Sequence, residues 1–244
     1  MRPTGRPPTR AGITGPRGRA QPSRAQPDPI HASEQSAMRE QTQRSRRKAE
    51  RRQQLLDASA QLFADRGFYS VSIEDLGATV GISGPAVYRY FPSKEALLAE
   101  LLVGASQRLF DGGQAEVHAG RSGEDVLRRL VAFHTDFAIR DTSLIRVQDR
   151  DLASLPPHEA GRVRRLQRAY VELWVSALRR VDPYAPAGVA RTKAHAVFGL
   201  LNSTPHIATN QPADGTRRVL ETMAMRALLG TSDPVSSEGS PAGR

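Results

Sequence analysis

Residues 72–98 read SIEDLGATVGISGPAVYRYFPSKEALL, and this stretch decides the fold. Ser72 opens the pattern of a helix N-terminal capping box, and Gly81 can supply the positive φ angle of a tight turn. A second short helix is expected over residues 83–91, because Pro92 then interrupts helical geometry. Two helices joined by so short a turn predict a helix-turn-helix, in which the second helix projects from the domain.

Helical periodicity continues on both sides of this motif. Ser45 is a plausible N-cap for a preceding helix that ends at Gly67, and Ser93 begins a following helix with a leucine-rich face. No stretch shows the clean alternation of a strand. Beyond the glycine pair at residues 112–113, further helices are predicted at about 124–140, 143–154, 159–181, 187–204 and 214–229. The predicted fold class is all-α, with an N-terminal three-helix domain that contains the helix-turn-helix and a C-terminal helical domain.

Composition divides the chain into four parts. Residues 1–44 are rich in Pro, Arg, Gly, Ser and Gln, with eight arginines against three acids, and are expected to form a disordered basic tail. Residues 45–107 form the predicted helix-turn-helix domain and residues 108–230 the C-terminal helical domain. Residues 231–244 are predicted to form a second disordered tail. Met38 is an alternative start, which would make the preceding residues an artefact.

Several classes of function are excluded by what the chain lacks. It has no cysteine, so disulfides, zinc-thiolate sites, iron–sulfur clusters and a cysteine nucleophile are ruled out. The six histidines show no metal-binding spacing, and there is no phosphate-cradling glycine loop or nucleophile elbow. We therefore expect no catalytic residue, no metal and no cofactor. Without a long apolar run or a signal peptide, the protein is expected to be cytoplasmic, with no membrane partner.

Positive charge is compatible with a polyanionic partner. The formal net charge is +10, but its local distribution is more informative, because arginines and one lysine gather at residues 44–52 with a single opposing acid, Glu50. Such a run is more often a solvated helix face, and both interpretations stay open at this point. On the projecting segment 83–91, two tyrosines and an arginine are poor core residues but suit phosphate and base contacts.

The motifs resemble a known family. Residues 65–68 (DRGF), 72–77 (SIEDLG), 81–83 (GIS) and 87–98 (VYRYFPSKEALL) are similar, in order and spacing, to the DNA-binding domain of TetR-family transcriptional regulators. The resemblance covers about 60 residues. It implies a sequence-specific DNA-binding repressor that acts as a homodimer on a palindromic operator and is released by a small-molecule effector.

The resemblance also implies roles for single residues. Tyr88 and Lys94 match positions that contact the DNA backbone, and Arg89 matches a base-reading position, where guanine is its preferred partner. Gly84 and Ala86 depart from the family, which often has longer polar side chains there, so base reading depends largely on Arg89. The predicted DNA-binding residues are Arg46, Arg47, Lys48, Ser72, Ser83, Gly84, Pro85, Ala86, Tyr88, Arg89, Tyr90 and Lys94.

The C-terminal domain is less constrained by sequence. The last two helices are expected to pair with those of a partner subunit through two apolar stripes, at 190–201 and 219–228. The candidate ligand-binding residues are Phe133, His134, Phe137, Tyr170, Trp174, Phe198, Asn202 and His206. The polar run 146–151 is interpreted as an i,i+4 ion-pair face. If it faced inward, an anionic or acyl-CoA-like effector would be favoured.

Two alternatives to a ligand-released repressor stay open. A ligand-independent architectural DNA-binding protein would use the basic tail as well as the helix-turn-helix, and would show steep salt dependence with little sequence preference. An activator would have the same sequence features as a repressor.

Overall fold

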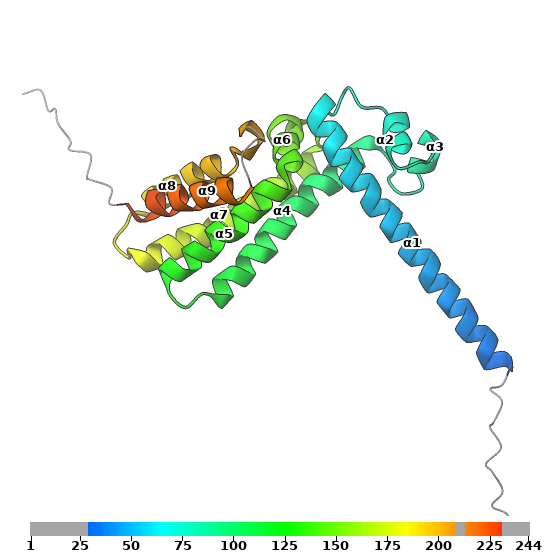
Figure 1. Cartoon of the computed structure of the whole chain (residues 1–244), viewed down its shortest axis with the longest axis horizontal. Coiled ribbons are helices and arrows are strands. Elements are labelled where there is room, and N and C mark those ends of the chain that lie inside the picture. Colours follow the sequence, from blue (N-terminus) through cyan, green and yellow to red (C-terminus); the bar gives the residue numbers. More distant parts are fainter. Residues whose placement is uncertain (1–28, 208–212, 231–244) are drawn as a thin grey trace, which may run out of the picture. The chain divides into compact units, whose positions relative to one another are not determined.

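The computed structural model describes residues 29–207 and 213–230, in which all regular structure is helical (Figure 1). The predicted all-α fold class is confirmed for these residues. The α-helices are α1 (Pro29–Arg66), α2 (Ile73–Thr79), α3 (Gly84–Val87), α4 (Lys94–Ala119), α5 (Gly123–Arg140), α6 (Thr142–Asp151), α7 (Pro157–Val181), α8 (Ala187–Leu201) and α9 (Ala213–Leu229), with 3-10 turns η1 (Leu152–Ser154) and η2 (Thr204–His206).

The first helix begins earlier than the sequence analysis predicted. It starts at Pro29 and not at Ser45, so residues 29–44 are helical and the prediction of a disordered tail is wrong for them. Proline is favoured at the first helical position, and residues 30–44 contain no further proline or glycine and many strong helix formers. Residues 1–28 and 231–244, the remainder of the two predicted tails, lie outside the described residues. The chain forms two units, residues 1–46 and residues 47–244.

The helix-turn-helix forms where it was expected. Ser72 caps α2 in a complete capping box with Asp75, and Gly81 adopts a φ of 70° in the turn that follows. Gly77 is required by packing, because a Cβ there would lie 2.6 Å from the Ile82 carbonyl oxygen. This close approach sets α3 against α2. The core beneath contains the fully buried side chains of Leu55, Phe63, Leu76, Val87 and Phe91.

Helix α4 passes through the glycine pair that was expected to end it. It continues to Ala119 because Gly112 and Gly113 are packing positions and not helix breakers. A Cβ at Gly112 would collide with the Phe133 ring, and one at Gly113 would lie 2.5 Å from the Tyr170 ring. The two glycines therefore let α4 approach α5 and α7, and the three helices pack pairwise (Figure 1).

Two hydrophobic clusters form the core of the described residues from 47 to 230. The first contains residues of the helices α1 through α4, of α6 and of the start of α7. It therefore crosses the predicted domain boundary at residue 107. The second lies among α5, α7, α8 and α9. It contains Ala190, Ala194, Val197 and Leu201 of α8, all buried within the subunit. The prediction that this stripe faces a partner subunit is therefore wrong, because α5, α7 and α9 already cover it.

Candidate DNA interface and effector site

The second element of the helix-turn-helix presents a small polar surface. Tyr88 has 54% of its side chain exposed, and Arg89 beside it is also exposed. Neither side chain has a hydrogen-bond partner within the described residues, so both are available to an external ligand. Tyr90, predicted to be a DNA-binding residue, is half-buried against the first core cluster. The other exposed members of the predicted set are Arg46, Arg47, Lys48, Ser72, Ser83 and Pro85, while Ala86 is half-buried.

Gly84 does not belong to the exposed surface. It is buried, and a Cβ there would lie 2.9 Å from Oε1 of Glu74. Gly84 therefore lies against the Glu74 side chain of α2 and presents no side chain to DNA. Helix α3 has four residues, and the Ser83 side chain makes no capping bond. Such a short helix weakens the expected dipole contribution at its N-terminus, so the side chains of Tyr88 and Arg89 matter more.

Lys94 has a structural role that the sequence did not reveal. Its Nζ donates hydrogen bonds to the carbonyl oxygens of Phe68, at 2.9 Å, and Val71, at 2.8 Å. It also lies 4.5 Å from the centroid of the Phe68 ring, in cation–π geometry. Two of its three donors therefore tie the turn between α1 and α2 to the start of α4. One donor is left for a phosphate, so the predicted backbone contact becomes a secondary role.

Replacing Lys94 by methionine is expected to lower the free energy of unfolding by about 2 kcal/mol, because two charge-assisted hydrogen bonds to half-buried carbonyls are lost. Urea unfolding measures this directly. Lys48→Met is the matched control, since Lys48 is exposed without a partner and the change should stay within about 0.5 kcal/mol. If both variants are equally stable and only the salt dependence of DNA binding changes, the structural role is wrong.

The basic run at residues 44–52 divides into two groups. Arg51 donates to the carbonyl of Val80 at 2.6 Å, and Arg52 pairs with Glu100 while lying 4.6 Å from the Phe91 ring. These two arginines anchor α1 to the helix-turn-helix and to α4. Arg47 and Lys48 remain exposed and available to phosphates. Only part of the run therefore contributes to a DNA surface.

Sequence reasoning missed Tyr69. Its side chain is 81% exposed in the turn between α1 and α2, and its ring packs edge-on to Phe68. The sequence signal for an exposed tyrosine was a second aromatic residue directly after Gly67 and Phe68. The core has no room for both rings in this segment. It adds another hydroxyl donor near the capped start of α2.

Most of the predicted effector-site residues converge in the second core cluster. The rings of His134, Tyr170 and Phe198 lie nearly parallel, with centroids 5.1 to 5.8 Å apart in each pair, and Trp174 packs edge-on to all three. Phe137 meets the His134 ring from the same helix. Phe133 packs on Gly112 and against the second core cluster but makes no ring contact with His134, and His206 is exposed. We call His134, Phe137, Tyr170, Trp174, Phe198 and Asn202 the ring cluster.

The polar atoms of the ring cluster are neutral. Asn202 Oδ1, 3.0 Å away, can only accept, so Nε2 of His134 carries the proton, and Nδ1 accepts from the Tyr170 hydroxyl at 3.2 Å. Burial lowers the pKa of His134 from 6.5 to about 4, against the opposing bond from Asn202, and burial raises the pKa of Tyr170 above its usual value. The Trp174 Nε1 is buried near the Tyr170 hydroxyl but has no acceptor in hydrogen-bonding geometry. The cluster therefore holds one donor without a partner.

The polar run at 146–151 is neither of the two arrangements considered from sequence. Arg146 donates to the carbonyl of Pro205 at 2.8 Å, and Arg150 binds carbonyls at the end of α1 and the buried carboxylate of Asp151. The two arginines therefore cap backbone groups on either side of α6. They form no i,i+4 ion-pair face with Asp149 and no clamp around the ring cluster.

Open clefts lie along α4, away from the ring cluster. One, of about 420 Å³, is bounded by α1, α4 and the α5–α6 corner, and another, of about 560 Å³, lies between α4 and the start of α7. Neither is lined by a member of the ring cluster. In the described part of the chain, no group of three His, Asp or Glu side chains is placed to hold a metal ion.

This arrangement defines a helix-turn-helix DNA-binding regulator with a separate helical domain. Residues 55–101 match the family model for bacterial regulatory proteins of the tetR family, and residues 120–206 match that for the tetracyclin repressor-like C-terminal domain. The chain belongs to the TetR family of transcriptional regulators, which are not enzymes. No helix in residues 29–207 and 213–230 is both long and apolar enough to cross a membrane.

Individual relatives agree with this assignment. The HTH-type transcriptional repressor KstR2 of Rhodococcus jostii is 26% identical over 193 residues, which cover 78% of this chain and 93% of that protein. The activator FasR of Mycolicibacterium smegmatis is 30% identical over 93 residues, 38% of this chain and 42% of FasR. The solved ketosteroid regulator KstR2 of Mycobacterium tuberculosis has a TM-score of 0.63 at 20% identity, covering 73% of this chain and 93% of that one.

Proposed function

We propose that the chain is a homodimeric repressor that binds a palindromic operator through Tyr88 and Arg89 and is released when a small molecule enters the ring cluster. The observation that carries the DNA-binding part is the exposure of these two side chains, without partners, on the projecting arm of the helix-turn-helix. Arg89 reads bases and Tyr88 fixes the register on the backbone. As a regulator of chromosomal operators, the protein acts in the cytoplasm.

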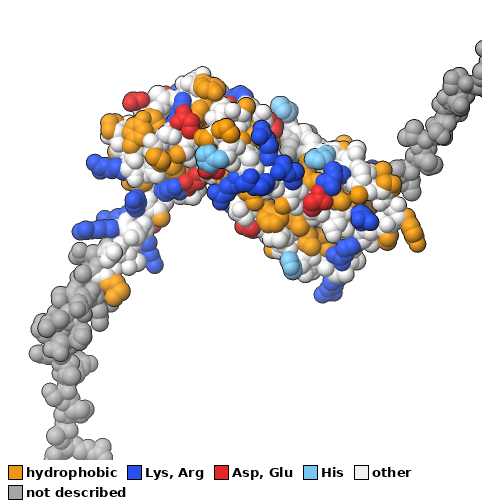
Figure 2. Space-filling model, turned by 180° about the vertical axis from the view of Figure 1, so that it is seen from behind, with side chains coloured by type: hydrophobic (Ala, Val, Ile, Leu, Met, Phe, Trp, Pro, Cys, Tyr) orange, Lys and Arg blue, Asp and Glu red, His pale blue; other side chains and the backbone are white. Residues whose placement is uncertain are grey.

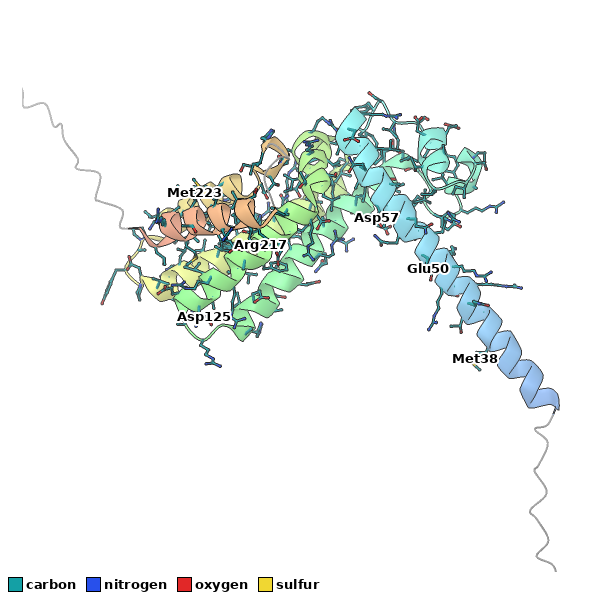
Figure 3. The ribbon with its side chains drawn as sticks, in the orientation of Figure 1. Met38, Glu50, Asp57, Asp125, Arg217 and Met223 are labelled. Atoms are coloured by element: carbon teal, nitrogen blue, oxygen red, sulfur yellow. The ribbon has the colours of Figure 1, made fainter. Side chains whose placement is uncertain are left out.

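Homodimerisation is supported by an apolar surface on the last two helices. Val219 and Met223 of α9 have 57% and 49% of their side chains exposed, and Val189 of α8 has 39% (Figure 3 labels Met223). A Cβ at Gly199 would meet no atom within 4 Å, so α8 presents a flat site to a second helix. Two copies related by a two-fold axis would cover this surface and place two recognition arms on inverted half-sites.

The ring cluster favours an effector with a flat, apolar and uncharged body. Its side chains are mostly aromatic, its polar members are neutral, and the unpartnered Trp174 Nε1 would donate to an acceptor on the ligand. An acyl-CoA-like effector would place only its acyl part there. An anionic group would have no partner, because Arg146 and Arg150 are bonded to backbone carbonyls.

Hydrogen bonds connect the ring cluster to the DNA-binding helices. Asn202, bonded to His134, caps the end of α8, and Thr204 in the next turn donates to the Ala138 carbonyl at 2.7 Å. Arg146 joins this turn to α6. On the other side of α6, Ser143 donates to Gln61 of α1 at 2.8 Å, and Arg150 caps the end of α1. A ligand that displaced Asn202 would therefore act on α6 and through it on α1.

Binding-site selection with the full chain tests the proposal. The wild type should recover an inverted repeat, and Arg89→Ala should lose preference at one or two positions in each half-site, at a cost of about 1–3 kcal/mol. Tyr88→Phe should weaken binding to every sequence alike, because its contact is with phosphate. An unchanged sequence preference for Arg89→Ala would show that Arg89 does not read bases. Steep salt dependence without any inverted repeat would favour the architectural alternative.

A further inference from the structure

The first half of α7 carries an unusual row of like charges. Arg162, Arg164, Arg165 and Arg168 all have exposed side chains, and no acid occurs between Glu159 and Glu172. We call these four residues the α7 arginine row. Residues three and four apart are neighbours on a helix surface, so the row contains several adjacent like-charge pairs, which destabilise an isolated helix.

The acids that could neutralise the row are engaged elsewhere. Glu159 lies 3.4 Å from Nε2 of His158, and Glu172 pairs with Arg191 of α8. Within residues 29–207 and 213–230, none of the four guanidinium groups has a hydrogen bond or an ion pair. Some arginines elsewhere in the fold are paired, such as Arg128 with Glu124 and Arg217 of α9 with Asp136 (Figure 3 labels Arg217). Others, such as Arg179 and Arg180, are exposed and have no partner within the described residues. What distinguishes the row is that four unpaired arginines lie within seven residues of one helix.

The surroundings of the row indicate the chemistry of its partner. None of the large exposed hydrophobic side chains lies between residues 161 and 169, so the patch lacks the apolar anchors of a protein interface or a membrane-binding helix. The face seen in Figure 2 shows Lys and Arg side chains gathered over the middle of the molecule. Arg162 shares a cleft with Glu95 and Glu159, but no ion pair joins either acid to it within the described residues. A linear series of four unpaired cations fits a polyanion whose charges repeat along a line.

We propose that the α7 arginine row is a second DNA contact, which binds the phosphate backbone of duplex DNA independently of α3 and of sequence. Arg162, Arg165 and Arg168 follow one another at three-residue intervals. At about 1.5 Å per residue the interval from 162 to 168 covers about 9 Å. One DNA strand presents a phosphate about every 3.4 Å along its axis, so this length matches about three phosphates. This contact is additional to operator recognition, which is the proposed role of Tyr88 and Arg89.

The salt dependence of binding to a non-operator duplex tests the row. The full chain is titrated with a 30-base-pair duplex of scrambled sequence at several KCl concentrations. The variant Arg162→Gln/Arg165→Gln/Arg168→Gln should lower the slope of log K against log salt by about 2 to 3 per bound subunit. The control Arg128→Gln/Arg179→Gln/Arg180→Gln removes the same charge from exposed positions outside the row and should leave the slope within about 0.5 of the wild type. Equal slopes for the two triple variants would overturn the proposal.

Thermal unfolding separates a binding role from a structural one. Neutralising Arg162, Arg165 and Arg168 removes the repulsion between their charges. The triple variant of the row should therefore unfold at the same temperature as the wild type or higher. A fall in melting temperature relative to the control would mean that the arginines support packing, and would overturn the proposal. The two proposals can fail separately. If the wild type showed no sequence preference, the proposed function would be wrong. The difference in salt slope between the two triple variants would still test the row.

The absence of cysteine allows a direct test of proximity. A single cysteine at position 165 or at position 128 can carry the same photo-crosslinker, because the chain has no native thiol. Cross-linking to the scrambled duplex is expected from position 165, at least fivefold above position 128. Equal yields at both positions would overturn the proposal.

Discussion

Replacing Arg150 by methionine is expected to lower the free energy of unfolding by about 3 kcal/mol. The Asp151 side chain is 5% exposed, and Arg150 is its partner, at 3.0 and 3.1 Å. Removing one member of a pair with a buried carboxylate leaves that charge without compensation. The same guanidinium also binds the carbonyls of Phe63 and Ala64, which end α1 beside Gly67.

Urea unfolding at fixed protein concentration measures this effect, and a double-mutant cycle isolates the pair. Asp151→Asn in the Arg150→Met background should recover part of the loss, because the buried group is then neutral. Arg128→Met is the matched control, since Arg128 pairs with Glu124 on the exposed face of α5 and such pairs contribute at most about 1 kcal/mol. If Arg150→Met costs no more than Arg128→Met, Arg150 does not anchor α6 to α1.

The features that the sequence predicted well are local ones. Ser72 and Ser93 cap helices through bonds to backbone groups three residues away, so short-range patterns were sufficient to place α2 and α4. The positive φ of Gly81 was predicted from the tight turn that it forms, and Gly67, which also has a positive φ, was predicted as a helix end. The exposed pair Tyr88 and Arg89 could be predicted because the turn before them fixes which side of the short helix projects.

The errors concern residues whose roles depend on distant partners. Gly112 and Gly113 look like a helix end, but their reason lies in the rings of Phe133 and Tyr170. Lys94 was predicted to contact DNA, which stays a prediction, but its bonds to carbonyls 23 and 26 residues earlier in the chain were not foreseen. No pattern within one helix contains this information, because the partner is brought near only by tertiary packing.

The stripe on α8 shows a related limit. Periodicity correctly identified an apolar face containing Ala190, Val197 and Leu201, but an apolar face can pack within a subunit or between subunits. Here the subunit's own helices cover it, and the exposed apolar residues Val219 and Met223 are on α9. For the ring cluster, helical spacing correctly predicted that the side chains of His134, Tyr170 and Trp174 lie in the interior. It could not distinguish them from His206, which follows the end of α8.

Lowering the pH from 7.5 to 5 is expected to destabilise the wild type, through His134, by about 2 kcal/mol. Burial lowers the pKa of this imidazole from 6.5 to about 4, so between these values the unfolded chain takes up a proton that the native state does not. The contribution of His134 is therefore complete above pH 6.5 and is lost progressively as the pH falls towards 4. Its total over that window is about 3 kcal/mol.

The single tryptophan makes this loss measurable at the site itself. Trp174 is fully buried, with its ring 6.1 Å from that of His134, so its emission reports unfolding of the ring cluster. His134→Phe should be less stable than the wild type at pH 7.5, because Tyr170 and Asn202 lose a buried partner. Its stability should nevertheless fall about 2 kcal/mol less between pH 7.5 and 5, since the carboxylates that titrate in both proteins cancel in the comparison. Parallel pH profiles for the two proteins would mean that His134 is not held neutral, and that the ring cluster can accept a charged ligand.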